Sequence, residues 1–154
     1  LRWVNAQHLK AMPDEALALA VTPFLAQRGI TPDERLQAIC ALFKDRCDTL
    51  VALANWATAF YGEVQASAEE LSQHVTPAVM PALALLTERL QSVAWDKASI
   101  AATIKEVLTA TGLKMPQLAM PVRVLLMGTA QTPSLDAVLA LCHREMVLSR
   151  LAKA

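Results

Sequence analysis

Apolar residues recur along most of this chain at the three- and four-residue spacing of an amphipathic helix. One face of a helix collects positions i, i+3, i+4 and i+7, so each such stripe predicts a helix with one buried side. The mostly apolar run from Met120 to Gly128 fits a buried helix or a buried strand, because periodicity alone does not separate the two. The clearest stripes are Leu36, Ile39, Cys40, Phe43 and Cys47, then Leu50, Leu53, Ala57 and Phe60, and then Ile100, Ile104, Val107 and Leu108.

Signals for helix N-termini also recur along the chain. A hydroxyl can accept a hydrogen bond from a backbone N–H that the first turn leaves unpaired, and proline has no such N–H. Ser67 with Glu70 three residues on is a capping box, and Gly112 is expected to end the helix before it. Other starts are expected at Pro13-Asp14-Glu15, Thr31-Pro32, Thr76-Pro77 and Thr132-Pro133.

These patterns predict an all-α protein with roughly eight to ten short helices and little or no sheet. The polar stretch from Gly62 to Glu70 separates two clusters of predicted helices. We therefore expect two packed helical subdomains, residues 1–66 and residues 67–154. The last segment, from Pro133 to Leu151, is expected to be helical with Arg144 and Arg150 on its polar side.

Composition supports this fold class and excludes several others. Of the 154 residues 55% are hydrophobic and only four are glycine, which favours helices and excludes a disordered chain. Three scattered cysteines exclude a disulfide scaffold and favour a reducing compartment, so the cytoplasm is expected. The longest apolar stretches, Ala16–Ala26 and Ala78–Leu86, contain a proline and fall short of the roughly 20 residues that cross a bilayer. We expect neither a membrane segment nor a secretory signal.

The formal net charge is zero, which argues mildly against a nucleic-acid partner, and no DNA partner is expected. The charge is nevertheless uneven: from Lys114 onward five basic residues face two acidic ones, a net +3 that leaves −3 for the rest. This basic end fits either an anion-binding face or a chance distribution of few residues.

Candidate residues for chemistry are sparse. Cys40 and Cys47 would lie two helical turns apart, about 10 Å along one helix, too far to share a zinc ion bound at about 2.3 Å. Cys142 and His143 are adjacent and would diverge by about 100° on a helix, which disfavours a nucleophile–base pair. We therefore expect no metal site and no catalytic residue in this chain.

Three stretches in order along the chain resemble bacterial glutamyl-tRNA synthetases. They are Leu1-Arg2-Trp3-Val4-Asn5, Arg46-Cys47-Asp48-Thr49-Leu50, and the stretch from Leu113 to Arg123 followed by Gly128 and Thr132-Pro133-Ser134-Leu135. The resemblance implies the all-helical, two-part anticodon-binding region of such a ligase. It also implies a separate catalytic domain, absent from this sequence, that uses ATP with Mg to join glutamate to tRNA.

The resemblance further implies which residues bind RNA. Arg46 stands where the family reads the last anticodon base, a cytosine, and a guanidinium with two parallel donors suits the O2 and N3 acceptors of that base. The positions matching the readers of the first two bases are Arg123, Thr132, Pro133 and Leu135. Splayed-out bases are recognised by such stacking and edge contacts, and Leu135 is expected to offer the apolar surface.

Arg144 is a candidate phosphate contact, since it keeps a charge where the family often has Gly-Lys. Pro116 and Met127 also depart from the family, which has glycine and threonine there. The implied partner is the anticodon loop of glutamate tRNA, bound by a monomer. The main alternative is a helical protein-interaction domain with no RNA affinity, in which Arg46 and Arg123 form structural ion pairs. A third hypothesis is a small helical enzyme that uses Cys142.

Overall fold

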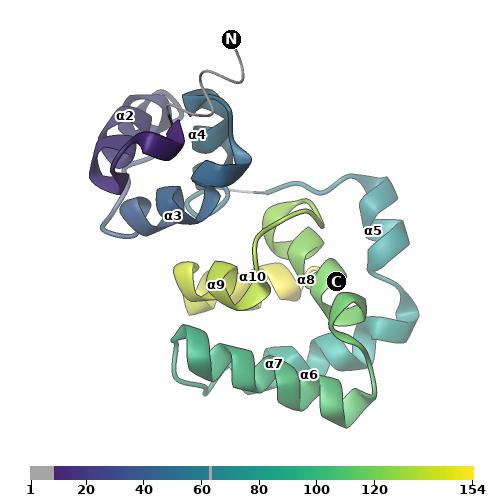
Figure 1. The fold of residues 1–154 in the computed structure, drawn as a ribbon. Helices are drawn as coiled ribbons and strands as arrows, with labels where there is room; N and C mark the ends of the chain where they lie inside the picture. Colours follow the sequence, from purple (N-terminus) through teal and green to yellow (C-terminus); the bar gives the residue numbers. More distant parts are fainter. Residues whose placement is uncertain (1–8, 63) are drawn as a thin grey trace. The chain divides into compact units, whose positions relative to one another are not determined.

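The structure is a computed structural model that describes residues 9–62 and 64–154. The chain divides into two compact units, Leu1–Glu63 and Val64–Ala154 (Figure 1). This division falls inside the polar stretch from Gly62 to Glu70, where the sequence predicted one after residue 66. All regular elements in these two ranges are helices, which confirms the predicted all-α class.

In the first unit, α2 (Asp14–Ala26), α3 (Leu36–Phe43) and α4 (Leu50–Thr58) each pack against the other two. A short 3-10 helix, η1 (Lys44–Arg46), follows α3 directly. The predicted stripes form its core, with Ile39, Phe43, Leu53 and Phe60 fully buried. The Phe43 ring stacks on Trp56 at 4.9 Å between centroids and meets Phe60 edge-on at 5.7 Å. These aromatic contacts join α3 to α4.

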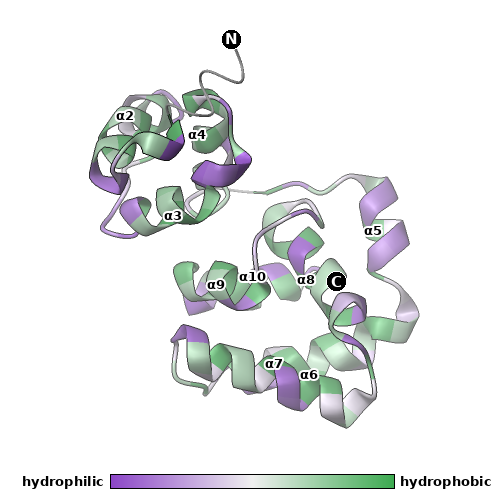
Figure 2. Ribbon diagram, in the orientation of Figure 1, coloured by the Kyte–Doolittle hydropathy of each residue, from purple (hydrophilic) through white to green (hydrophobic). Residues whose placement is uncertain are grey.

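The second unit begins with α5 (Ala68–His74), η2 (Pro77–Val79), α6 (Met80–Leu90) and α7 (Lys97–Thr111). It continues with α8 (Met115–Met127), α9 (Leu135–Leu141) and α10 (Arg144–Leu151). Helices α6 and α7 pack side by side, α9 covers α7, and α10 packs against α6 and α8 (Figure 1). Helix α5 is mostly hydrophilic and buries no side chain completely (Figure 2), yet it lies against α8. No helix in residues 9–62 and 64–154 is long and apolar enough to cross a membrane.

Two of the helix ends that the sequence predicted are confirmed. The Ser67 hydroxyl accepts a hydrogen bond from the backbone N–H of Glu70 at 3.1 Å and starts α5. Gly112 ends α7 in the left-handed conformation, at φ +73°. The ambiguous run from Met120 to Gly128 is the second half of helix α8, not a strand.

Two predicted helix starts are wrong. Helix α3 begins at Leu36 rather than beside Thr31-Pro32, because the Asp33 carboxylate accepts a hydrogen bond from the Arg35 N–H and holds a turn there. Helix α9 begins at Leu135 rather than at Thr132-Pro133, and no side chain caps it. The Thr132 hydroxyl instead donates to the Pro133 carbonyl at 3.0 Å. A hydroxyl beside a backbone carbonyl can fold a local turn as readily as it can start a helix.

The C-terminal segment also differs from its prediction. It is two helices interrupted at Cys142–His143, and Arg150 is 6% exposed rather than on a polar face. The Arg150 Nη1 donates to the Leu126 carbonyl at 2.8 Å, one of the last carbonyls of α8. Such carbonyls have no partner within their own helix, so a buried guanidinium is stabilised there. Burial lowers the pKa of Arg150 from its usual value.

We expect Gly128→Ala to destabilise the second unit more than Gly112→Ala. Both glycines end a helix at positive φ, +76° and +73°, which costs a non-glycine residue about 1–2 kcal/mol. A Cβ on Gly128 would also lie 2.8 Å from Val64 Cγ1 and 3.3 Å from the Gln65 carbonyl oxygen, whereas one on Gly112 meets nothing within 4 Å. Denaturant unfolding should show an additional loss of about 1–3 kcal/mol for Gly128→Ala. Equal losses would contradict the packing of Val64 over Gly128.

Candidate functional site

Arg46 is an exposed side chain at the end of η1. Among the residues that the structure describes, its guanidinium has no hydrogen bond or ion pair, although Asp45 and Asp48 flank it in the sequence. The structural ion pair that the protein-interaction alternative requires of Arg46 is therefore not formed there. Because Arg46 is exposed, its guanidinium donors can reach a ligand.

The backbone beneath Arg46 is held on both sides. Phe43 is fully buried before η1, and Cys47 is 4% exposed after it. Thr49 then caps α4, since its hydroxyl accepts from the Ala52 N–H at 3.0 Å. The loop therefore presents an exposed cation on a fixed base, which is the arrangement needed for directional hydrogen bonds.

The second group of predicted residues lies in the other unit, on α8 and the segment that leads into α9. Arg123 is half-buried on α8, and its Nη2 donates to the Pro133 carbonyl at 3.4 Å. Thr132, which is 6% exposed, donates to the same carbonyl. The structure thus brings Arg123, Thr132 and Pro133 together, although they come from two segments.

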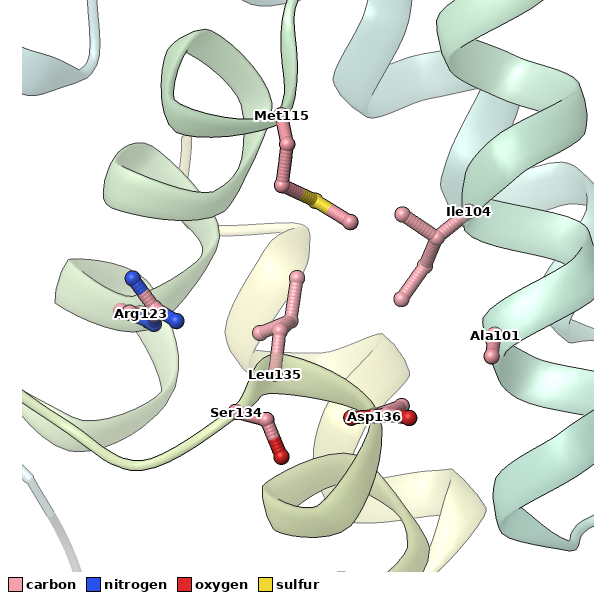
Figure 3. Close-up of a pocket in the computed structure, with 7 residues that line it drawn as sticks. All are labelled: Ala101, Ile104, Met115, Arg123, Ser134, Leu135 and Asp136. Carbon is pink, nitrogen blue, oxygen red and sulfur yellow. The ribbon is translucent and has the colours of Figure 1, made fainter.

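A pocket of about 200 Å³ opens beside this group. In Figure 3 the Leu135 side chain projects toward Met115, with the Arg123 guanidinium on one flank and Ile104 on the other. Apolar walls with a few polar groups at the edge are typical of sites for small flat ligands. Its lining residues are Ala101, Ile104, Met115, Arg123, Ser134, Leu135 and Asp136.

The sequence did not indicate most of the residues that line this pocket. Ile104 was recognised only as one position of a buried helical stripe, and Met115 only as part of a resembling stretch. Asp136 offers a carboxylate that can accept an N–H, while Arg123 offers donors. That these residues line one pocket becomes evident only when α7, α8 and α9 pack together.

Arg144 is already engaged within the second unit. Its Nη2 donates to the Val93 carbonyl, and its guanidinium carbon lies 5.2 Å from the Trp95 ring centroid. Trp95 in turn donates from Nε1 to the Cys142 carbonyl at 2.7 Å. Together these contacts tie the start of α10 to the loop before α7, so a phosphate would have to share this guanidinium with the fold.

The cysteines are poorly placed for chemistry. Burial raises the pKa values of Cys40 and Cys47 to about 11, so their thiols stay protonated at neutral pH. Cys142 is 2% exposed, which bars a substrate from its sulfur. Within residues 9–62 and 64–154, no cluster of His, Cys, Asp and Glu is arranged to hold a metal ion.

Comparison with known proteins decides which family this arrangement belongs to. A family model described as the anticodon binding domain matches residues 16–154. The chain belongs to the anticodon-binding domain family. This assignment confirms the resemblance that the sequence motifs indicated.

Curated relatives of this anticodon-binding domain are named glutamate–tRNA ligase. The protein from Albidiferax ferrireducens is 67% identical over 151 residues, covering 98% of this chain and 33% of the relative. The protein from Paracidovorax citrulli is 65% identical over 158 residues, covering 100% of this chain and 33% of the relative. The chain therefore spans about a third of the length of these relatives.

Solved structures share its fold. The glutamate tRNA ligase of Elizabethkingia meningosepticum superposes with a TM-score of 0.89 at 24% identity, over 99% of this chain and 31% of that one. A glutamate-tRNA synthetase from Elizabethkingia anophelis gives a TM-score of 0.83 over 99% of this chain and 30% of that one. At this identity the likeness establishes the helical architecture alone.

Leu135 is more deeply buried in this anticodon-binding domain than a base-stacking residue on an open surface would be. It is 3% exposed, so a base would touch it only from inside the pocket. Leu135 consequently supports the fold as well as lining the pocket.

We expect Leu135→Ala to lower the free energy of unfolding by about 2–4 kcal/mol, the cost of emptying a core position. Met115 lines the same pocket but is 48% exposed, so Met115→Ala should change stability by no more than about 0.5 kcal/mol. Denaturant unfolding of both variants measures the difference. A stable Leu135→Ala variant would show that Leu135 is dispensable to the core.

Proposed function

We propose that this chain binds the anticodon loop of glutamate tRNA as part of a glutamate–tRNA ligase. The parent protein would join glutamate to the tRNA with ATP and Mg bound by its other domains, and this part would supply recognition without catalytic residues. We further propose that the ligase acts as a monomer in the cytoplasm. The observation that carries the proposal is the exposed Arg46 guanidinium on an anchored loop, in a chain of the anticodon-binding domain family.

The proposed role of Arg46 is to read the last anticodon base. A planar guanidinium presents two parallel N–H donors, which match the O2 and N3 acceptors of cytosine. Uracil carries an N–H at position 3, so one of the two donors would meet another donor. The anchored backbone supports this role because paired hydrogen bonds require a fixed approach angle.

The proposed roles in the second unit concern the first two anticodon bases. Arg123 borders the pocket beside Leu135 and supplies donors at its edge, while the apolar walls offer a surface for an unstacked base. Thr132 and Pro133 shape the approach, since the Thr132 hydroxyl and the Arg123 guanidinium both donate to the Pro133 carbonyl. Arg144 is proposed only as an auxiliary phosphate contact.

We expect Arg46→Ala to weaken binding of the glutamate anticodon stem-loop by about 1–3 kcal/mol, the usual loss for a paired base contact. Arg46→Lys should recover little, because an ammonium cannot supply two parallel donors. Fluorescence anisotropy with the full-length ligase measures both variants, using stem-loops that end the anticodon in cytosine or uracil.

Arg89→Ala is the matched control for the lost charge. Arg89 lies on α6 in the other unit and pairs with Glu106 at 2.8 Å on the surface. This variant should bind both stem-loops as the parent does. If Arg46→Ala instead binds the two loops with unchanged preference and only a lower melting temperature, Arg46 is structural and the proposed function fails.

Binding should depend only weakly on salt. The chain has no net charge, and its basic end can neutralise about two or three phosphates, which for single strands gives a log–log slope of about −2. Titrating potassium chloride during stem-loop binding to the ligase measures this slope. A slope several times steeper would mean that phosphate contacts dominate over base recognition.

A further inference from the structure

The Lys44–Asp14 ion pair involves the same 3-10 turn that carries the proposed base-reading arginine. Lys44 is the first residue of η1 and Arg46 the last, so the two share one turn. The Lys44 Nζ lies 3.1 Å from Oδ1 of Asp14, the first residue of α2 and 30 positions earlier in the chain. We propose that Asp14 is a positioning residue, which orients Arg46 toward the last anticodon base by holding Lys44. This inference rests on the proposed function of Arg46.

The ion pair adds a side-chain restraint to a 3-10 turn whose two ends are already held. None of its three side chains is buried, in contrast to Phe43 before it and Cys47 after it. The buried side chains of Phe43 and Cys47 fix the two ends of the turn. Contacts of surface side chains oppose rotation of the turn about the line that joins these ends. Among the described residues, the pair with Asp14 is the side-chain link from this turn to another helix. Rotation of the turn would change the direction in which the Arg46 guanidinium points.

The ion pair is suited to orientation rather than to stability. The Lys44 and Asp14 side chains are 23% and 36% exposed, so water screens their attraction in part. Asp14 also stands at the N-terminal end of α2, where the helix dipole favours a negative charge. Loss of the pair should therefore leave the unit folded and loosen the turn.

A direct role of Lys44 in binding RNA phosphate is the competing explanation, and Asp14 distinguishes the two. Removing the Asp14 charge weakens its hold on the Lys44 ammonium and makes the surface more positive. A phosphate contact would then be unchanged or strengthened, whereas positioning through the ion pair predicts weaker recognition. The informative variant is thus Asp14→Asn rather than a change of Lys44 itself.

The test uses the full-length ligase and the same two anticodon stem-loops, ending in cytosine or uracil. Asp14→Asn should reduce the preference for cytosine by about fivefold, the upper range for a partly exposed ion pair, with an unchanged melting temperature. Asp14→Glu, which can still reach Lys44, should restore the preference. Glu15→Gln is the matched control, because it removes the neighbouring exposed carboxylate from the same first turn of α2 and should have no effect.

Coupling to Arg46 completes the test. In an Arg46→Ala background, Asp14→Asn should cause no further loss, since the residue it orients is gone. If Asp14→Asn behaves like Glu15→Gln while Arg46→Ala still loses discrimination, positioning by Asp14 is overturned and the proposed function stands. If Arg46→Ala itself leaves discrimination intact, both are overturned.

Discussion

Packing of short helices, most of them through a buried apolar face, is the constraint on which this chain depends. Five of its helices, α3, α4, α5, α9 and α10, have only seven to nine residues. Isolated helices shorter than about 12–15 residues are marginal in water, so these elements persist only because they pack. In the first unit the Phe43 stack on Trp56 supplies such packing, and it also fixes the start of η1. The stability of the core and the placement of Arg46 consequently share one set of contacts.

The contacts that these arginines make differ with their burial. Arg150 is enclosed and donates to the end of α8, so its charge serves the fold. Arg123 and Arg144 are half-buried and each reaches a carbonyl of another segment. Arg46 is exposed without such a contact among the described residues. The same side chain therefore acts as a structural tie or as a ligand-binding group, depending on whether the fold supplies an acceptor for it.

Apart from Arg123, which lies within α8, the candidate binding groups lie at helix ends and in connecting segments. Arg46 follows α3, Thr132 and Pro133 precede α9, and the pocket is closed by three helices. Helix ends leave backbone groups and side chains free to face a ligand, while the helix bodies provide a rigid base. The proposed recognition would use hydrogen bonds and apolar contact, which require neither a metal nor a reactive thiol.

The sequence by itself determined the features that depend on near neighbours in the chain. The apolar stripes placed α3, α4 and α7, and Ser67 and Gly112 marked two helix ends, because each signal acts over three or four residues. The resembling motifs identified the family and the candidate residues Arg46 and Arg123. Tertiary structure alone decided the burial of Arg150 and Leu135, the walls supplied by Ile104 and Met115, and the pairing of Lys44 with Asp14. Those features require partners distant in sequence, and a hydroxyl such as Thr132 or a charge such as Arg150 takes whichever partner the packed chain brings within reach.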